Sequence, residues 1–307
     1  MKPALTFDVI GLGAATVDIL SLVDHFPAQE EVQQALEVTL QGGGPVATAL
    51  VTLARLGGRA AMIDVIGADW RGDLIVDEFE RAGVCTDYLQ RVTGAASATS
   101  SILVRQRDGA RSIIFCPSTA PEVPATAISP ELIASAKILH VNGRHWPACL
   151  QACRLARQQG VKVSFDGGAH RYNPEISQLV RLTDICIVAR DFARQYTGLA
   201  EIELAAARLL AEGPELVVIT DGVRGSWVYP QTGPSFHQPA FRLPQVVDTT
   251  GCGDSYHGAF LFGLVRGYGL KDTAALASAV AALNAQRLGG RGGLPTLAEV
   301  TEFLANS

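Results

Sequence analysis

Short apolar segments alternate with longer amphipathic segments along most of the chain, and this alternation constrains the fold more than any other feature. The short segments are rich in β-branched residues, as buried strands are, and the longer ones have helical spacing. Strands that alternate with helices predict a parallel sheet with crossover helices, hence an α/β protein. The expected core strands are 7–12, 60–66, 138–141, 163–166, 185–188 and 216–220, and the expected helices are 46–56, 74–82, 148–159, 202–211, 255–268 and 273–287.

Composition excludes several classes of protein. The 307 residues, 48% of them hydrophobic and 18% charged, suit a compact domain with a large core. A net charge of −5 without a basic cluster predicts no nucleic-acid partner. No apolar run reaches the ~18 residues of a membrane span, so no membrane association is expected. The six cysteines show no Cys-x-x-Cys spacing, which argues against a zinc site or disulfide framework and favours the cytoplasm.

Two regions interrupt the alternation. Residues 17–41 contain two short amphipathic runs, and residues 98–116 read as a hairpin around Asp108-Gly109, a turn signal. Four strands without crossover helices predict a small antiparallel or mixed sheet that stands off the main one. No linker, repeat or low-complexity tract divides the chain, so we expect one domain over 1–307 with this sheet attached.

The segment Asp248-Thr249-Thr250-Gly251-Cys252-Gly253-Asp254-Ser255 carries the strongest chemical signal. The β-branched Val246-Val247 predicts a strand before it, and a helical pattern follows. The two glycines permit a tight turn whose N–H groups, at the positive end of the helix dipole, would stabilise charge on phosphate oxygens. Asp254, in the first helical turn, could accept a proton from a substrate hydroxyl. The alternative is an ordinary helix cap.

This segment resembles the C-terminal signature of the ribokinase-like (PfkB) carbohydrate kinases, usually Asp-Thr-Thr-Gly-Ala-Gly-Asp, with Cys252 in place of alanine. The resemblance implies a three-layer α/β/α sandwich in which the small sheet is a lid over the sugar. It implies that Asp254 is the catalytic base and that Gly251, Cys252 and Gly253 form the anion hole. Because such lids are often dimer surfaces, it also implies a homodimer through the lid.

Further motifs of this family mark the substrate end. Gly42-Gly43, before a helix with Pro45 at its first position, would leave bare backbone against a ligand. Asp18, five residues after a glycine, takes the family's sugar-binding aspartate role; the alternative is a solvated residue at the lid edge. The sequence departs from the pattern at Ala47 and at Gly44, where relatives have asparagines that contact sugar hydroxyls.

Two arginines suggest an anionic substrate. Arg105 would lie on the lid hairpin, and Arg144 follows a core strand in a stretch that resembles ketohexokinases. A guanidinium grips phosphate or sulfonate in a bidentate manner, and sulfofructose kinases are the nearest such case in the family. Either arginine could equally be an ordinary surface residue. Asp166, at the end of a core strand, should face the ligand crevice.

The nucleotide end is marked by Thr220, Gly222 and Gly225, which resemble the family's Thr-x-Gly-x-x-Gly segment. The resemblance adds Thr250 and Asn284 to the expected ATP site. The family's Asn-x-x-Glu motif, associated with magnesium and phosphate, is replaced by residues 189–192, Ala-Arg-Asp-Phe. Magnesium is therefore expected to arrive with ATP, and no metal ligand is assigned.

The resemblance implies an ATP-dependent kinase that phosphorylates a hydroxyl of a sugar, possibly an anionic one. A nucleoside kinase of the same fold and a non-catalytic sugar or nucleotide sensor remain alternatives. A NAD-dependent oxidoreductase is disfavoured because Thr16 replaces the third glycine of a dinucleotide fingerprint. Cys252 either fills an alanine-sized space or, as a thiol beside an anion site, acts as a redox brake.

Overall fold

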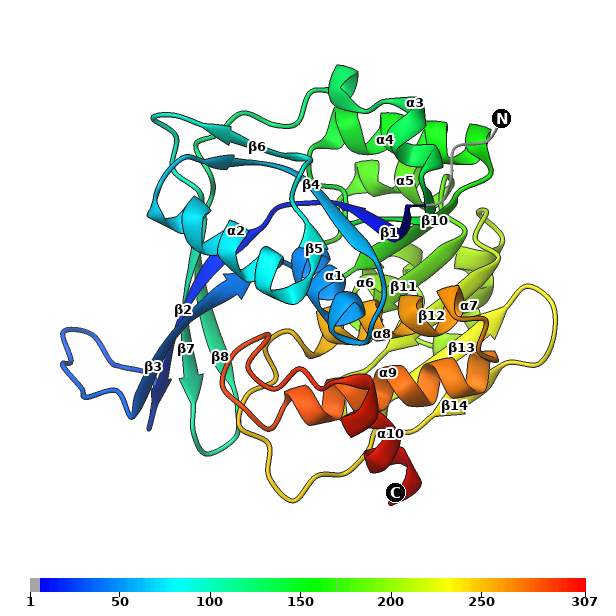
Figure 1. The fold of residues 1–307 in the computed structure, drawn as a ribbon. Helices are drawn as coiled ribbons and strands as arrows, with labels where there is room; N and C mark the ends of the chain where they lie inside the picture. Colours follow the sequence, from blue (N-terminus) through cyan, green and yellow to red (C-terminus); the bar gives the residue numbers. More distant parts are fainter. Residues whose placement is uncertain (1–5, 170) are drawn as a thin grey trace.

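A computed structural model describes residues 6–169 and 171–307. Over these residues the chain forms a main sheet of ten strands and a separate sheet of four (Figure 1). The main sheet runs β14-β13-β12-β11-β10-β9-β1-β4-β5, with β6 also paired to β4; β13 and β14 are antiparallel and the rest parallel. In chain order the strands are β1 (Phe7–Leu12), β4 (Ala60–Gly67), β5 (Val84–Cys85), β6 (Leu89–Val92), β9 (Ala136–Val141), β10 (Lys162–Gly167), β11 (Ile185–Ala189), β12 (Leu216–Thr220), β13 (Ser226–Pro230) and β14 (Phe236–Gln238).

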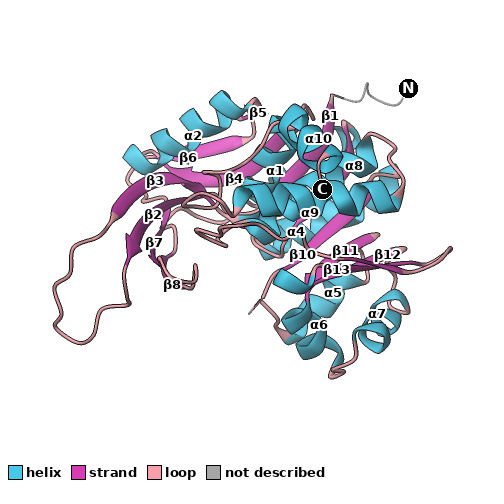
Figure 2. Ribbon diagram, turned by 90° about the horizontal axis from the view of Figure 1, so that it is seen from below, coloured by secondary structure: helices cyan, strands magenta, loops and turns pink. Residues whose placement is uncertain are grey.

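Helices cover both faces of the main sheet (Figure 2). One face carries α3 (Pro130–Ala134), α4 (Trp146–Gln159), α5 (Ser177–Val180), α6 (Arg190–Thr197) and α7 (Ile202–Leu210). The other carries α1 (Pro45–Arg55), α2 (Trp70–Ala82), α8 (Cys252–Val265), α9 (Leu270–Asn284) and α10 (Leu297–Ala305). Within the described ranges, none of these helices has the length and apolar character needed to cross a bilayer.

The two cores follow from the alternation of side chains along buried strands. In β1, Ile10 and Leu12 pack into the core on the α4 side, whereas Val9 packs into the core on the α8 side. A strand buried on both faces must be apolar at every position, which explains the continuous hydrophobic runs in the sequence. The three-layer α/β/α fold is confirmed.

The second sheet is the expected lid. It contains β2 (Thr16–Val23), β3 (Glu37–Gly43), β7 (Ala98–Arg105) and β8 (Arg111–Cys116), in the order β3-β2-β7-β8. The sheet is mixed, because β2 and β7 are parallel and the outer pairs antiparallel. Its inner face packs Leu20, Leu22, Ile102 and Val104 against Leu288, so it lies against the loop after α9.

The sequence misplaced some local elements. Val246 and Val247 belong to no strand; the Val247 N–H donates to the Ala285 carbonyl at 2.8 Å, in an extended connection. The Asp254 helix begins at Cys252, three residues early, and α9 ends at Asn284 rather than at 287. The antiparallel edge strands and the short helices α6 and α10 were not anticipated.

Candidate active site

The turn before α8 presents bare backbone. Gly251 adopts φ 70°, a left-handed conformation that favours glycine, and an added Cβ there would overlap the backbone of Gly290. Gly253 is exposed, and a Cβ built on it meets nothing. The first N–H groups of a helix have no acceptor within it and favour a bound anion. In α8 the Cys252 N–H makes only a long hydrogen bond, 3.4 Å, to the Thr249 carbonyl of the preceding turn. The arrangement suits the anion hole expected from Gly251, Cys252 and Gly253.

Asp248 fixes this turn in place. Its carboxylate is fully buried and accepts hydrogen bonds from Thr250 N at 2.8 Å and from Gly289 N at 2.9 Å. One side chain therefore joins the turn before α8 to the glycine-rich loop after α9. The Thr250 hydroxyl is buried and has no partner among the described residues. Its role toward ATP stays a prediction.

The Asp254 carboxylate has a raised pKa and caps no helix N–H group among the described residues. Among the described residues no hydrogen-bond partner holds its carboxylate, and only burial and nearby charges act on it. Burial, followed by the negative charge of Asp166, raises the pKa of Asp254 to about 6, although Arg171 and Arg111 act in the opposite direction. A carboxylate with a pKa near the working pH is suited to general base catalysis.

Two arginines that the sequence analysis did not single out lie near Asp254. Arg111, on lid strand β8, donates from Nη1 to Thr249 Oγ1 at 2.7 Å. Arg171, in the loop after β10, donates from Nη1 to Asp166 Oδ2 at 3.0 Å. The sequence could have indicated Arg171 by its position just past the end of a core strand. It could have indicated Arg111 by its position at the start of a lid strand. Together they bring two positive charges to the Asp254 carboxylate.

At the substrate end, Asp18 and the glycines Gly42 and Gly43 lie together. The Asp18 carboxylate is buried against Gly43, where a Cβ would overlap it, and its Oδ1 accepts from Thr16 Oγ1 at 2.8 Å. Gly42 N donates to Glu78 Oε2 at 2.7 Å. Burial raises the pKa of Asp18, although the hydrogen bond from Thr16 lowers it. The sugar-binding role of these residues stays a prediction.

Arg291 is another residue the sequence did not reveal. It is buried in the loop after α9 and donates to Glu78 Oε2 and to the Gly43 carbonyl, both at 3.0 Å. It thereby ties the glycine-rich loop to the substrate-end glycines. An arginine in a run of glycines gave no sequence signal, because its partners are more than 200 residues away.

The two arginines that the sequence suggested as substrate ligands, Arg105 and Arg144, do not lie together with Arg111 and Arg171. Arg105 makes a bidentate ion pair with Asp108 in its own hairpin, at 2.9 and 2.8 Å, and lies over the Phe26 ring. Arg144 is exposed and lines a cavity of about 120 Å³ that also contains Asp64 and Glu122. The largest effects of positive charge on the Asp254 carboxylate come from Arg171 and Arg111, and not from Arg105 or Arg144. Substrate binding by Arg105 or Arg144 stays a prediction.

The nucleotide segment lies at the end of β12. Thr220 ends that strand, and Gly222 and Gly225 have φ of 51° and 90° in the turn that leads into β13. Asn284 is fully buried, and its amide bonds both Gly290 O and Gly293 N, at 2.9 and 3.1 Å. Its amide therefore shapes the glycine-rich loop. Contact of these residues with ATP stays a prediction.

Cys252 is a packed thiol. Its Sγ lies 3.4 Å from the Ala281 carbonyl, between α8 and α9. Burial, with the charge of Asp248 next, raises the pKa of Cys252 to about 12. The helix dipole would lower this pKa, but burial outweighs it. The thiol is therefore protonated at neutral pH, which favours packing over the redox brake.

The described residues do not form a resident metal site, since no group of three or more His, Cys, Asp or Glu side chains among them could hold an ion. Asp166 is engaged by Arg171, and Asp221 pairs with Arg190 and Arg224.

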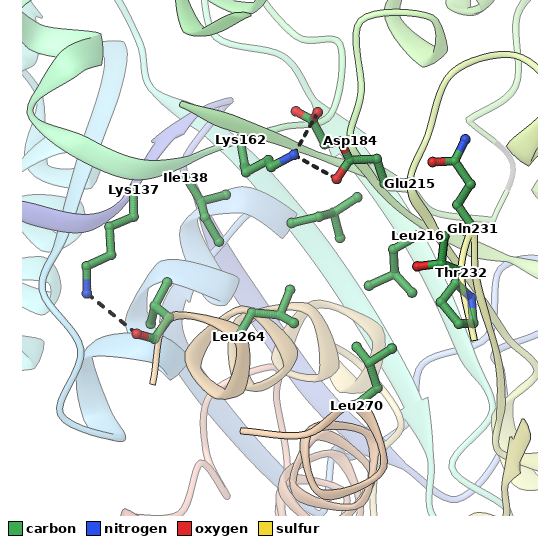
Figure 3. A pocket seen from close by; sticks show the side chains of 13 residues that line it. Lys137, Ile138, Lys162, Asp184, Glu215, Leu216, Gln231, Thr232, Leu264 and Leu270 are labelled. Atoms are coloured by element: carbon green, nitrogen blue, oxygen red, sulfur yellow. Dashed lines mark hydrogen bonds and ion pairs between the residues drawn. The ribbon is translucent and has the colours of Figure 1, made fainter. Parts of the chain in front are cut away.

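A wide cavity of about 780 Å³ lies at the opposite edge of the sheet (Figure 3). It is lined by residues at the amino ends of β9 to β12 and by Leu264 near the end of α8. Its lysines are engaged: Lys162 with Asp184 and Glu215, and Lys137 with Asp8 and the Val265 carbonyl. The Asp254 site is at the other end of α8, so this cavity does not belong to it.

A three-layer fold with a strand lid, and a glycine turn before α8 with the buried Asp254 carboxylate in the first turn of that helix, are the features of a kinase of the ribokinase type. The sequence matches the pfkB family of carbohydrate kinases over residues 7–297, and this chain belongs to that family. It is a carbohydrate kinase, a phosphotransferase.

Known proteins are similar to nearly the whole length of the chain. A 5-dehydro-2-deoxygluconokinase from Shouchella clausii is 28% identical over 320 residues, covering 96% of this chain and 94% of that protein. Adenosine kinase from Sinorhizobium meliloti is 26% identical with a TM-score of 0.85, covering 97% and 99% of the two chains. Arabidopsis thaliana ribokinase, solved with ribose and ATP, has the same fold, at 24% identity, a TM-score of 0.84 and 98% and 99% coverage.

Proposed function

We propose that this carbohydrate kinase transfers the γ-phosphoryl group of Mg·ATP to a hydroxyl of an anionic sugar, namely a sugar acid. The observation that carries the proposal is the convergence of Arg111 and Arg171 on Asp254 from two different elements. Arginines grip a carboxylate through paired N–H donors. The Shouchella clausii relative is named for a sugar acid, which supports the same substrate class.

In this proposal Asp254 accepts the proton of the attacking hydroxyl. The N–H groups of Gly251, Cys252 and Gly253 stabilise the charge on the transferring phosphoryl group. Asp18 and the backbone of Gly42 and Gly43 orient the sugar. Such positioning and charge stabilisation account for most of the catalysis in phosphoryl transfer. The magnesium ion is part of the nucleotide substrate.

The substrate class is tested by an assay coupled to ADP release. We expect 5-dehydro-2-deoxygluconate and related sugar acids to give the highest kcat/KM, above fructose, ribose and nucleosides. A preference for adenosine would favour a nucleoside kinase, as the similarity to adenosine kinase allows. ATP binding without turnover on any compound would favour a sensor.

We also propose a homodimer through the outer face of the lid, in a reducing cytoplasm. In the sheet register, Ile19, Val38, Leu40, Leu103 and Ile114 share the outer face. Three of them are large exposed apolar residues: Val38 at 57%, Leu40 at 47% and Ile114 at 71%. Apolar side chains gathered on one exposed sheet face favour association.

Sedimentation velocity tests the dimer. Ile114→Glu should give a monomer, because it places a charge at the most exposed apolar residue of this face. Val223→Glu is the matched control, since Val223 is 96% exposed and lies outside the lid. A wild-type monomer, or equal effects of both substitutions, would contradict dimerisation through the lid.

A further inference from the structure

A cluster of buried polar side chains lies behind Asp254. Its members are His140 on β9, Ser164 and Asp166 on β10, and His257 on α8, each less than 5% exposed. Ser164 is the strand neighbour of His140, and His140 Nδ1 lies 3.1 Å from Ser164 Oγ. The two imidazole rings are 5.5 Å apart, and His257 Nε2 lies 3.5 Å from Asp166 Oδ1.

This cluster lowers the stability of the folded protein relative to an apolar core. Burial of polar groups costs free energy unless each has a partner. Among the described residues, His140 Nε2 and His257 Nδ1 have none. Apolar residues of similar volume would fill the space between β9, β10 and α8 without that cost. A cluster that is expensive to bury, beside a candidate base, points to a role in the reaction.

The tautomer of His257 follows from its surroundings. Burial lowers the pKa of His257, so its ring is neutral at pH 7 and carries one N–H. Asp166 lies beside Nε2, whereas Nδ1 has no acceptor among the described residues. The N–H therefore belongs on Nε2 and points at Asp166. His140, whose pKa burial lowers to about 3, is also neutral.

Asp166 thus has a nitrogen neighbour at each oxygen. Oδ1 faces His257 Nε2, and Oδ2 accepts from Arg171 Nη1 at 3.0 Å. Burial raises the pKa of Asp166, but its neighbours His257, Arg171 and His140 together outweigh burial and lower it. Asp166 therefore remains an anion in the interior.

Asp254 and His257 are three residues apart on α8, a spacing that places them on one side of the helix. Asp166 therefore meets the side of α8 that carries the base. We propose that His257 is a positioning residue: its Nε2–H holds Asp166 as a fixed anion beside Asp254 and so strengthens the base. This inference rests on the proposed role of Asp254.

Several groups act on Asp254 and must be separated in any pH measurement. The negative charges of Asp166 and Asp18 raise its pKa, and the positive charges of Arg171 and Arg111 lower it. Arg291 also interacts with Asp254, and the Cys252 thiol lies in the same turn. Of these, Asp166 lies next to His257, and the charge of Arg171 also acts on it. A substitution of His257 leaves the Arg171 side chain in place and therefore reports on Asp166.

The experiment compares His257→Leu with His257→Gln, whose side-chain amide can donate in place of Nε2. Without a donor, Asp166 takes up a proton more readily and Asp254 loses its negative neighbour. In the leucine variant we expect kcat to fall roughly tenfold, the scale of a hydrogen bond to a charged group. The acid limb of the kcat/KM profile should move to lower pH, while the KM for ATP stays unchanged. Glutamine should restore both.

Asp166→Asn tests the same charge directly and should shift the acid limb the same way, by about one pH unit. His140→Leu is the matched control, because His140 is equally buried but makes no hydrogen bond or ion pair with Asp166 and acts on its pKa less than His257 does. It should lower the melting temperature and move the acid limb less than His257→Leu does. Equal profile shifts in the His140 and His257 variants, or no shift in His257→Leu and Asp166→Asn, would overturn the inference. Failure of the proposed base would instead appear as normal turnover in Asp254→Asn.

Discussion

Arg111 Nη1 lies 2.7 Å from Thr249 Oγ1, and this hydrogen bond joins the lid to the turn that precedes α8. Arg111 is the first residue of β8, on the same face of the sheet as Val104 and Leu22, which pack toward Leu288. The position of the lid is therefore coupled to the position of the proposed anion hole. An anionic substrate could engage the same guanidinium.

The first prediction concerns Arg111. Arg111→Ala should lower kcat/KM for a sugar acid by about 10–100-fold, the scale of charge-assisted hydrogen bonds. A neutral sugar of the same size should lose far less. Arg105→Ala is the matched control on the same hairpin, because its guanidinium is engaged by Asp108. Larger losses in the Arg105 variant would return the anion-binding role to that residue.

The second prediction concerns the base. Asp254→Asn preserves shape but cannot accept the proton, so turnover should fall by ~10²–10⁴-fold, the usual contribution of general base catalysis. Binding of ATP, measured by calorimetry, should barely change. Turnover close to that of the wild type on a confirmed substrate would refute the assignment.

The third prediction is a dependence of stability on pH. The pKa of Asp254 is about 6 in the folded protein against 3.8 for the free side chain, so the native state binds the extra proton between these values. Stability should therefore rise as the pH falls from about 6 toward 4, as far as this group contributes. Above pH 6 the buried Asp254 carboxylate is charged, and this charge lowers the free energy of unfolding of the wild type. Asp254→Asn, which carries no charge, should therefore unfold at a higher temperature than the wild type.

The difference in melting temperature between Asp254→Asn and the wild type should shrink as the pH falls toward 4. Differential scanning calorimetry from pH 4 to 8 measures it without any substrate. A constant difference over this range would show that the pKa of Asp254 is not raised.

Much of the fold could be read from the sequence because the signals are local. The strands Phe7–Leu12 and Leu216–Thr220 were predicted to the residue, since a fully buried strand is apolar throughout. Val246 and Val247 show the limit of this reasoning. Their composition is typical of strands, but here no strand in the described part of the chain pairs with them, and Val247 bonds to the end of α9 instead.

Some residues of the candidate site were likewise predictable from local sequence, and others were not. Asp254 and its glycines form a contiguous motif, so their arrangement was predictable. Arg111, Arg171 and Arg291 owe their positions to partners from 5 to 250 residues away, and nothing local distinguishes them from surface arginines. Arg105 shows the converse. Its position on the lid suggested a substrate ligand, but Asp108, three residues away, engages its guanidinium.

A fourth prediction concerns the sugar-binding lid. Asp18→Asn should raise the KM for the sugar strongly and leave the KM for ATP within a few-fold, because the carboxylate lies beside Gly43, at the expected sugar end. The matched control is Glu37→Gln, an exposed carboxylate on lid strand β3. Equal increases in both Michaelis constants would indicate a general disturbance of the fold.

The last prediction concerns the cysteines. Because the pKa of the Cys252 thiol is raised to about 12, almost none of it is thiolate at neutral pH, and the thiolate is the form that reacts with peroxide and with alkylating reagents. Cys116, exposed on lid strand β8, should be alkylated first, as peptide mass spectrometry would show. Activity should survive this labelling, and Cys252→Ala should respond to peroxide as the wild type does. Inhibition that ATP prevents and that Cys252→Ala abolishes would instead restore the redox brake beside the anion hole.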